Sequence, residues 1–391
     1  MVIRFINTII IISCLSCLTG CWSRIEINDR AFVTSMYIDY LEDGIYEVSL
    51  GFPLPNRMTT GVGISLGINT GNPYSIVTKR GESIPVAIRK IRSDLSREIS
   101  WGHCRVIVVG RKLAEFGIDQ ILEFAAREPN FHTKTFVFVS PTKGVDIAKL
   151  TPVFEGLPSE VLREFARRHV TLGATIKDFL ETKASGGDML TGMLTIGQTE
   201  MISEKGKNST WVGTDGAALF KKGVMVGTLD VIGMRAGLWI KGRMKSSMNS
   251  IKSPTDGKTI SFLIQMSKSS IKPLLNGNQI EFNISIEAED DVLSSESDLD
   301  LMDPKQIQLL ENLLADQLKE RILRTLKATQ SKEVDVFNFG RILAWRYPQV
   351  WKQNKEHWHE RYKDCQFHVT TQIHVKRTGA EKNSVIKEQQ K

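Results

Sequence analysis

The sequence predicts a protein of the α+β or mixed α/β class. It divides into an N-terminal α/β domain and a C-terminal domain of antiparallel hairpins with long helices. Three observations support this. Strand and helix patterns alternate in the first half, turn signals join paired strands in the second half, and a long amphipathic helix follows those strands. The chain has 391 residues, of which 41% are hydrophobic and 24% charged, so it can form two or three domains with real cores.

The first half begins with a strand pair. Residues 31–40 and 45–52 have strand composition, and the Asp43-Gly44 signal between them predicts a hairpin. A helix is expected after Ser83, because serine can cap a helix and the apolar residues behind it recur at 3.6-residue spacing. The other elements expected in this half are strands 105–109 and 135–139 and helices 112–126, 159–168 and 175–182.

A polar segment separates the two expected domains. Residues 203–210 are rich in Lys, Asn and Gly, which is the composition of a linker. The sequence therefore predicts an N-terminal α/β domain over 21–202 and a C-terminal α+β domain over 211–378, the latter as one or two subdomains. The polar and charged residues 379–391 are expected to form a disordered tail.

Two hairpins are expected after the linker. Lys221-Lys222-Gly223 is a turn signal between short strands, and Asn276-Gly277 is the strongest type I′ signal in the chain. The strand pairs expected are 217–220 with 224–228, and 259–271 with 279–289. A last strand over 367–375 alternates apolar and polar residues, so one of its faces should be buried and the other exposed to solvent.

Helices are expected between the last two of these strands. Asp303-Pro304 supplies an N-cap followed by proline at the first helical position. The helix that follows carries one apolar side, made of Ile307, Leu310, Leu314, Leu318, Ile322 and Leu326. A second helical cluster is expected over 336–362. Within it, Trp351 and Trp358 are two helical turns apart, so they should share one side, which either packs into the core or faces a partner.

The N-terminus predicts export and a lipid anchor. Arg4 and the mostly apolar run from Phe5 to Leu18 have the pattern of a signal peptide over residues 1–20. That run is shorter than the roughly 20 residues of a membrane-spanning helix. Leu18-Thr19-Gly20-Cys21 resembles a bacterial lipoprotein lipobox, so Cys21 is the expected attachment site for thioether-linked diacylglycerol and an N-acyl chain. An ordinary signal peptide with a chance cysteine is the alternative.

The net charge is modest and spread out. The formal charge of +7 loses one unit when Arg4 is removed, and the remaining Lys and Arg are interspersed with Asp and Glu. Such a surface favours an anionic membrane beneath an anchored protein. It does not form the concentrated basic stripe that nucleic-acid binding requires, so no nucleic-acid partner is expected.

The cysteines that remain in the mature chain are too few for a disulfide framework or a metal site. Of the five in the precursor, two are lost with the signal peptide and Cys21 is modified, so Cys104 and Cys365 remain. One pair so distant in sequence provides no disulfide framework and no metal site, although a single bridge between the two stays possible.

No catalytic, cofactor or metal site is expected. Gly63-Ile64-Ser65-Leu66-Gly67 matches the pattern of a nucleophile elbow, but no strand enters it and no helix leaves it. His357 and His359 are two apart on an expected helix and point to different sides. His368 and His374 share a strand face but lie about 20 Å apart at 3.3 Å per residue. All four are expected to be surface histidines.

Together with the lipobox, three further stretches resemble one protein family. They are Glu26-Ile27-Asn28-Asp29 leading into Ala31-Phe32-Val33, the Asn276-Gly277 hairpin with its helix, and Asp335-Val336-Phe337-Asn338-Phe339-Gly340 with Tyr347-Pro348 and Trp351. In this order they resemble the Ger(x)C family of spore germination lipoproteins. The resemblance covers essentially the whole precursor, from the lipobox to the closing Val375-Lys376-Arg377-Thr378-Gly379.

This resemblance implies a function without catalysis. It implies a C subunit of a nutrient germinant receptor, lipid-anchored on the extracytoplasmic face of a membrane, the outer face of the spore inner membrane, beside integral A and B subunits. Cys21 is the one functional residue that carries over. The alternative is a substrate-binding lipoprotein of a transporter, which would need two doubly wound lobes. The sequence does not say which nutrient is recognised or whether this subunit contacts it.

Overall fold

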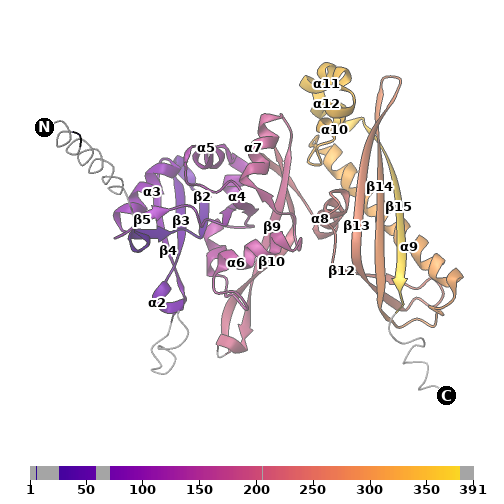
Figure 1. Ribbon diagram of the computed structural model, residues 1–391, viewed down its shortest axis with the longest axis horizontal. Coiled ribbons are helices and arrows are strands. Elements are labelled where there is room, and N and C mark those ends of the chain that lie inside the picture. The colour runs from indigo at the N-terminus through magenta and orange to yellow at the C-terminus, as the bar shows by residue number, and fades with distance from the viewer. Residues whose placement is uncertain (1–5, 7–25, 59–70, 205, 379–391) are drawn as a thin grey trace.

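A computed structural model describes residues 6, 26–58, 71–204 and 206–378. Nearly all of the expected signal peptide, Cys21, the Gly63–Gly67 motif and the tail 379–391 lie outside the described residues. The chain forms two bodies side by side (Figure 1), and both mix helices with sheet, which confirms the predicted fold class.

The first domain is built on a sheet with nine described strands. Eight of them follow the order β11-β10-β9-β7-β6-β2-β3-β4, and β8 pairs with β7. The neighbours β2, β6, β7 and β9 run parallel, whereas the strands on both flanks are antiparallel. The bounds are β2 (Ser35–Tyr40), β3 (Tyr46–Pro53), β4 (Tyr74–Gly81), β6 (Val106–Val109), β7 (Phe136–Val139), β8 (Ala174–Thr175), β9 (Met189–Met201), β10 (Lys207–Lys221) and β11 (Val224–Leu229).

Helices cover both faces of this sheet, because its central strands are apolar on both sides. One face packs against α3 (Ile84–Ser93), α4 (Arg111–Phe116), α5 (Asp119–Arg127) and α7 (Ile176–Ala184). The other face packs against the 3₁₀ segment η4 (Gly144–Lys149) and α6 (Pro158–Arg167). The described short elements outside the sheet are α2 (Pro55–Met58), η1 (Ile27–Asp29), η2 (Glu42–Gly44) and the pair β1 (Arg30–Phe32) with β5 (Glu98–Ser100).

The predicted cap at Ser83 is confirmed, since its side chain accepts a hydrogen bond from the Val86 N–H. Two predicted elements are each divided into two in the structure, so their prediction as single elements is wrong. The strand over 31–40 divides into β1 and β2, because Val33 bonds to Ser100 and Thr34 to Gly51. The helix over 112–126 breaks into α4 and α5 at Gly117, which has a φ of +132°, a backbone conformation that glycine adopts readily.

The predicted linker over 203–210 is also wrong. Its first residues belong to the 3₁₀ segment η5 (Ile202–Glu204), and β10 begins at Lys207 and pairs with β9 from there on. The polar composition reflects the exposed arms of this hairpin and not a lack of structure. The predicted turn after Lys221 is confirmed, with positive φ at Lys222 and Gly223, and it returns the chain as β11. The first sheet thus extends to Leu229.

The second domain is a four-stranded sheet in the order β12-β13-β14-β15. Its strands are β12 (Ser247–Lys252), β13 (Thr259–Asn276), β14 (Gln279–Ser295) and β15 (Gln366–Arg377). The β13–β14 hairpin is confirmed, but its two loop residues are Gly277 and Asn278 and only Gly277 has positive φ, which is the type II′ pattern and not I′. The domain is also not purely antiparallel, because β15 runs parallel to β14.

Helices make the crossover from β14 to β15. The helix α9 (Pro304–Ser331) begins at the predicted Asp303 cap, and its apolar side is buried from Leu310 to Leu326. The cluster predicted over 336–362 divides into α10 (Phe339–Arg346), α11 (Pro348–Asn354), η6 (Lys355–His357) and α12 (Trp358–Lys363), because Pro348 ends the first helix. The indoles of Trp351 and Trp358 still meet, with ring centroids 5.3 Å apart.

One apolar core joins the two domains. The helix α8 (Val231–Ile240) lies between the two sheets (Figure 1), and most of its residues are buried. Leu190 and Leu219 of the first sheet belong to the same buried cluster as Phe337 and Phe282 of the second domain. The domains are therefore packed against each other through hydrophobic side chains.

A buried polar network crosses the same junction. Asp188, 1% exposed, lies in the first domain and accepts a 2.8 Å hydrogen bond from the backbone N–H of Asp335 in the second. The Asp335 carboxylate in turn accepts bonds from the N–H groups of Phe339 and Gly340 and from Trp358 Nε1, at 2.7 to 2.8 Å. His359 Nε2 lies 3.1 Å from Asp188, so the prediction of a surface histidine at this position is wrong.

The two retained cysteines lie in different cores. Cys104 packs in the cluster on the first sheet and Cys365 in the cluster of the second domain, and both are free and buried. The bridge that the sequence left open is therefore not formed. Burial raises the pKa of each thiol to about 12.

One core position in the second domain holds a carboxyl group. Asp290 of β14 is 1% exposed and stands between the buried residues Ala288 and Val292 on the helix-covered face of the sheet. Desolvation by burial, and to a lesser extent the neighbouring Asp291, raises its pKa from 3.8 to about 6.

Asp290→Asn should remove a pH dependence of stability. Because ionisation is disfavoured in the folded state, wild-type stability falls as the pH rises from about 4 through 6, by up to about 3 kcal/mol. The variant lacks that ionisation, so its advantage over the wild type should be larger at pH 7.5 than at pH 4.5. Urea titrations at both pH values measure it. Asp316→Asn, at an exposed position on α9, is the control, and equal pH profiles for wild type and Asp290→Asn would refute the prediction.

The two tryptophans, whose rings meet edge to face, should differ in their contribution to stability. Trp358 is 4% exposed and hydrogen-bonded to Asp335, whereas Trp351 is only partly buried against the same core. Trp358→Ala is expected to lower the free energy of unfolding by about 3 to 5 kcal/mol, and Trp351→Ala by clearly less. Urea denaturation of the two variants tests this, and an equal loss for both would contradict it.

Candidate functional site

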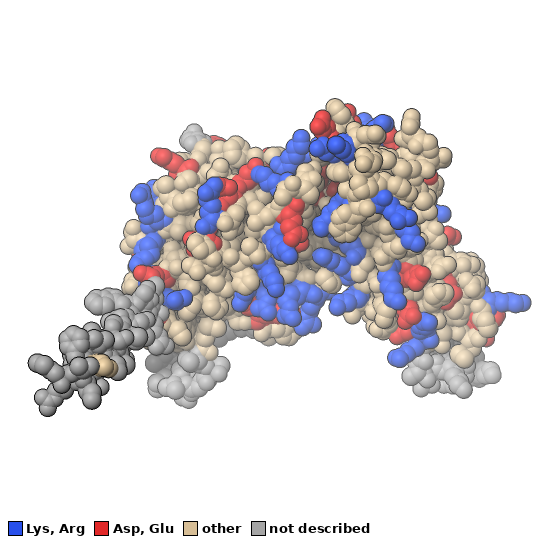
Figure 2. Space-filling view, turned by 45° about the horizontal axis from the view of Figure 1, so that its top comes forward, with Lys and Arg blue, Asp and Glu red and all other residues tan. Residues whose placement is uncertain are grey.

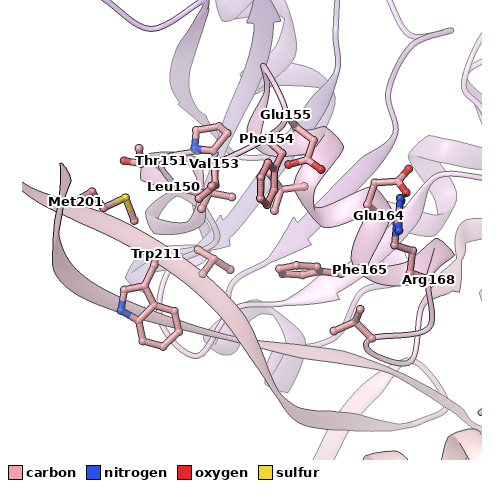
Figure 3. Close-up of a pocket in the computed structure, with 14 residues that line it drawn as sticks. Leu150, Thr151, Val153, Phe154, Glu155, Glu164, Phe165, Arg168, Met201 and Trp211 are labelled. Carbon is pink, nitrogen blue, oxygen red and sulfur yellow. Dashed lines mark hydrogen bonds and ion pairs between the residues drawn. The ribbon is translucent and has the colours of Figure 1, made fainter. Parts of the chain in front are cut away.

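The first domain carries an open apolar groove of about 520 Å³ (Figure 3). Its walls come from the segment between η4 and α6, from α6 itself, and from the β9–β10 hairpin. The residues that line it are mostly apolar: Leu150, Thr151, Pro152, Val153, Phe154, Glu155, Val161, Glu164, Phe165, Arg168, Val170, Met201, Trp211 and Val212. We call this set the apolar groove.

Hydrogen bonds fix the segment that forms one wall. In β2, the buried carboxylate of Asp39 accepts bonds from the N–H groups of Gly144 and Val145, at 2.7 and 3.3 Å, and so holds the start of η4. Burial raises the pKa of Asp39, and these two bonds oppose the rise. Further along, Tyr74 donates its hydroxyl to the Leu150 carbonyl at 3.2 Å, and the Thr151 N–H bonds to the Thr210 carbonyl at 2.9 Å. The wall is thus tied to the sheet at both ends.

Trp211 on β10 forms the opposite wall. Its register partner on β9 is Gly197, and a Cβ atom there would come within 2.5 Å of the indole ring. Gly213, two residues further along β10, would meet the same ring at 3.1 Å. The absence of side chains at both positions leaves room for the indole against the hairpin, at the edge of the groove (Figure 3).

The rim of the groove at α6 is charged. Arg167 and Arg168 bond to the Glu164 carboxylate at 2.7 and 3.2 Å. Partial desolvation of Glu164 is outweighed by these bonds, so its pKa is lowered. Glu164 therefore stays ionised and paired, and the groove combines an apolar floor with a satisfied polar edge.

Several apolar side chains of the groove have little protein around them. Phe154 is 93% exposed and Val153 72%, and Ile202 at the tip of the adjoining hairpin is 97% exposed. Contiguous exposed apolar surface of this kind marks sites of contact with proteins or membranes. The groove presents apolar contact area, and its lining includes no serine, cysteine or histidine that could act as a nucleophile or base.

The sequence did not indicate this site. Of the predicted site residues, Cys21 lies outside the described residues. The Trp351–Trp358 pair packs against the core, which confirms the prediction of a core position over the alternative of a side that faces a partner. The one available signal was the apolar Pro152-Val153-Phe154, which lies outside every predicted element.

Groups that could hold a metal ion do not occur among the described residues. His359 pairs with Asp188, and His368 Nε2 lies 2.9 Å from Glu281 on the neighbouring strand. Within the same ranges, no helix combines the length and the apolar character that crossing a membrane requires. Figure 2 shows Lys and Arg side chains interspersed with Asp and Glu over the face in view, as the sequence predicted.

Comparison with known proteins defines the class of this two-domain architecture. The family model described as "Spore germination protein N-terminal domain" matches residues 23–196, and the one described as "Spore germination B3/ GerAC like, C-terminal" matches residues 215–379. Together they account for most of the chain. The chain therefore belongs to the Ger(x)C family of spore germination proteins, as its motifs predicted.

Individual relatives agree over nearly their whole length. Spore germination protein KC of Bacillus subtilis (strain 168) is 24% identical over 384 residues, covering 94% of each chain. Spore germination protein YndF of the same organism is 23% identical over 397 residues, covering 96% of each. The solved structure of the GerBC protein has the same fold, with a TM-score of 0.57 and 19% identity over 87% of this chain and 96% of that one.

Proposed function

We propose that this chain is the lipid-anchored, non-enzymatic C subunit of a spore nutrient germinant receptor, needed for the germination response to nutrients. The observation that carries the proposal is the position of the lipobox. Cys21 stands two residues before the point where the family's N-terminal domain begins, so the anchor would connect directly to the folded part. The relatives that match over nearly their full length bear the name of spore germination proteins.

The anchor would place the chain on the extracytoplasmic side of a membrane, the outer face of the spore inner membrane. A single acyl chain binds a membrane only marginally, whereas diacylglycerol with a further N-acyl chain holds stably. The partners would then be the integral A and B subunits of the receptor, which share that membrane.

The apolar groove is the surface on which we place an integral partner. A chain tethered by its N-terminus meets extracytoplasmic segments of membrane subunits at high effective concentration, so even a modest contact suffices. A segment of this kind with apolar side chains would fit the groove, which offers Phe154, Val153 and Trp211 to receive it. The paired charges at its rim would keep the contact specific without adding a buried unpaired charge.

A transporter's substrate-binding lipoprotein fits the architecture less well. That class needs a cleft between two doubly wound lobes. Here the second domain is a four-stranded sheet with helices on one face, and an apolar core fills the junction between the domains.

Cys21→Ala should abolish the anchor. Without the thiol no diacylglycerol can be attached, so the protein should carry no thioether-linked lipid, should leave the membrane fraction or stay as uncleaved precursor, and should weaken germination with the matching nutrient. Mass spectrometry of the N-terminal peptide and membrane fractionation measure this. Cys17→Ala, four residues upstream in the same signal, is the matched control and should remain lipidated. Acyl chains on the Cys21→Ala protein would refute the anchor.

Phe154→Glu should separate docking from folding. Phe154 is 93% exposed, so the change should alter stability by no more than about 0.5 kcal/mol. It places a charge in the apolar contact, and the protein should no longer co-purify with the integral subunits from spore membranes. Trp345→Glu, at a 75% exposed aromatic residue on α10 in the other domain, is the matched control. Unchanged co-purification of Phe154→Glu would exclude the groove as the docking surface.

A further inference from the structure

A second cavity lies inside the second domain, away from the apolar groove. It is bounded by α8, α9 and the sheet strands β12 to β15, and its volume is about 180 Å³. Most of the surrounding side chains are apolar, but three charged residues also line it: Arg235 on α8, Arg321 on α9 and Asp290 on β14. Packing by itself does not require charges at such positions, because the neighbouring core is hydrophobic.

One oxygen of the Asp290 carboxyl group is left without a hydrogen bond among the described residues. This atom, Oδ1, is fully buried. A buried polar atom without a partner costs about 1 to 3 kcal/mol, and more when it is charged. An apolar residue at this position would pack with Ala288 and Val292 at no such cost, so a ligand that bonds to the carboxyl group would explain why it is there.

The two guanidinium groups bond only to neutral partners. Arg235 Nη2 donates to Ser247 Oγ at 2.5 Å and to the Met248 carbonyl at 2.7 Å. Arg321 donates to Asn249 Oδ1 at 3.2 Å and to Gln317 Oε1 at 3.3 Å. Within the described ranges neither forms an ion pair with a carboxylate.

Both arginines are also partly desolvated. Burial, and then the other cations around them, lowers the pKa of each guanidinium: Arg321 acts on Arg235, and Arg324 acts on Arg321. Two neighbouring cations without a counter-charge form a site that an anion would stabilise.

The volume limits the size of the ligand. A protein cavity of about 150 Å³ holds benzene, so this one suits a molecule of roughly six to eight non-hydrogen atoms. Its apolar walls, which include Trp239, Leu314 and Leu318, suit a short hydrocarbon segment between two polar ends.

We propose that this cavity binds a small organic molecule with two polar ends, a carboxylate held by Arg235 and Arg321 and an amine held by Asp290. The site goes beyond the proposed function and depends neither on the lipid anchor nor on the apolar groove. Recognition at both ends would also make the site selective for the distance between the charges.

A series of ω-amino acids of increasing length tests whether the site selects for the distance between the two charged ends. Glycine, β-alanine, 4-aminobutanoate, 5-aminopentanoate and 6-aminohexanoate differ only in the separation of their ends. Calorimetric titration of the full chain in detergent should show one length bound about tenfold or more tighter than butanoate or butylamine, which each offer a single end. If none of the series binds better than these single-ended molecules, the proposal is wrong.

Variants test which residue binds each end of the ligand. Asp290→Asn, which keeps the shape of the side chain, should remove the advantage of the amine while leaving butanoate binding unchanged. Arg321→Gln should weaken every carboxylate in the series and leave butylamine unchanged. Lys319→Gln, at an exposed cationic residue on the same helix that does not line the cavity, is the matched control. Circular dichroism checks the fold of each variant, and a folded Asp290→Asn protein with the wild-type preference would overturn the assignment.

Discussion

The arrangement of the two domains depends on the contact between Asp188 and the backbone of Asp335. Both residues are buried. The Asp188 carboxylate accepts a bond from a backbone N–H far away in sequence, and the Asp335 carboxylate accepts bonds from the backbone N–H groups of Phe339 and Gly340 just after it. Desolvation raises the pKa of Asp335, and the bonds from Gly340, Trp358 and Phe339 oppose that rise. A carboxylate in such a place stabilises the fold only while every donor stays in position. The junction is therefore sensitive to displacement of either domain, although hydrophobic contacts also join the two domains.

The same contact explains a motif that the sequence showed without a reason. In Asp335-Val336-Phe337-Asn338-Phe339-Gly340, the aspartate holds the first N–H groups of α10, and Asn338 takes a left-handed conformation with φ of +63°. Gly340 is required by packing, since a Cβ atom there would lie 2.6 Å from Trp358 and 2.8 Å from Trp351. Each polar or small residue in this stretch thus has a geometric function, and the aromatic residues close over it.

Local signals in the sequence predicted local structure well. The caps at Ser83 and Asp303 and the turn at Lys222-Gly223 depend on nearby atoms, and all three are confirmed. The errors depend on partners distant in the chain. Residues 207–210 looked like a linker because their partner strand β9 was not recognised as a long hairpin arm, and the parallel pairing of β15 follows from the crossover through α9. The apolar groove could not be predicted for the same reason. Its walls come from segments that are separate in sequence and that only the folded sheet brings together.

The two sites are places where the sequence departs from what stability alone would favour. The groove leaves Phe154 in solvent, where a polar residue would cost nothing, and the cavity places Asp290 where an apolar residue would pack better. Natural proteins keep such departures mainly where function requires them. The Leu18-Thr19-Gly20-Cys21 pattern is a third feature of this kind, and it is the one from which we propose the lipid anchor. A search for residues that fit their local surroundings poorly therefore finds the features that the fold by itself does not explain.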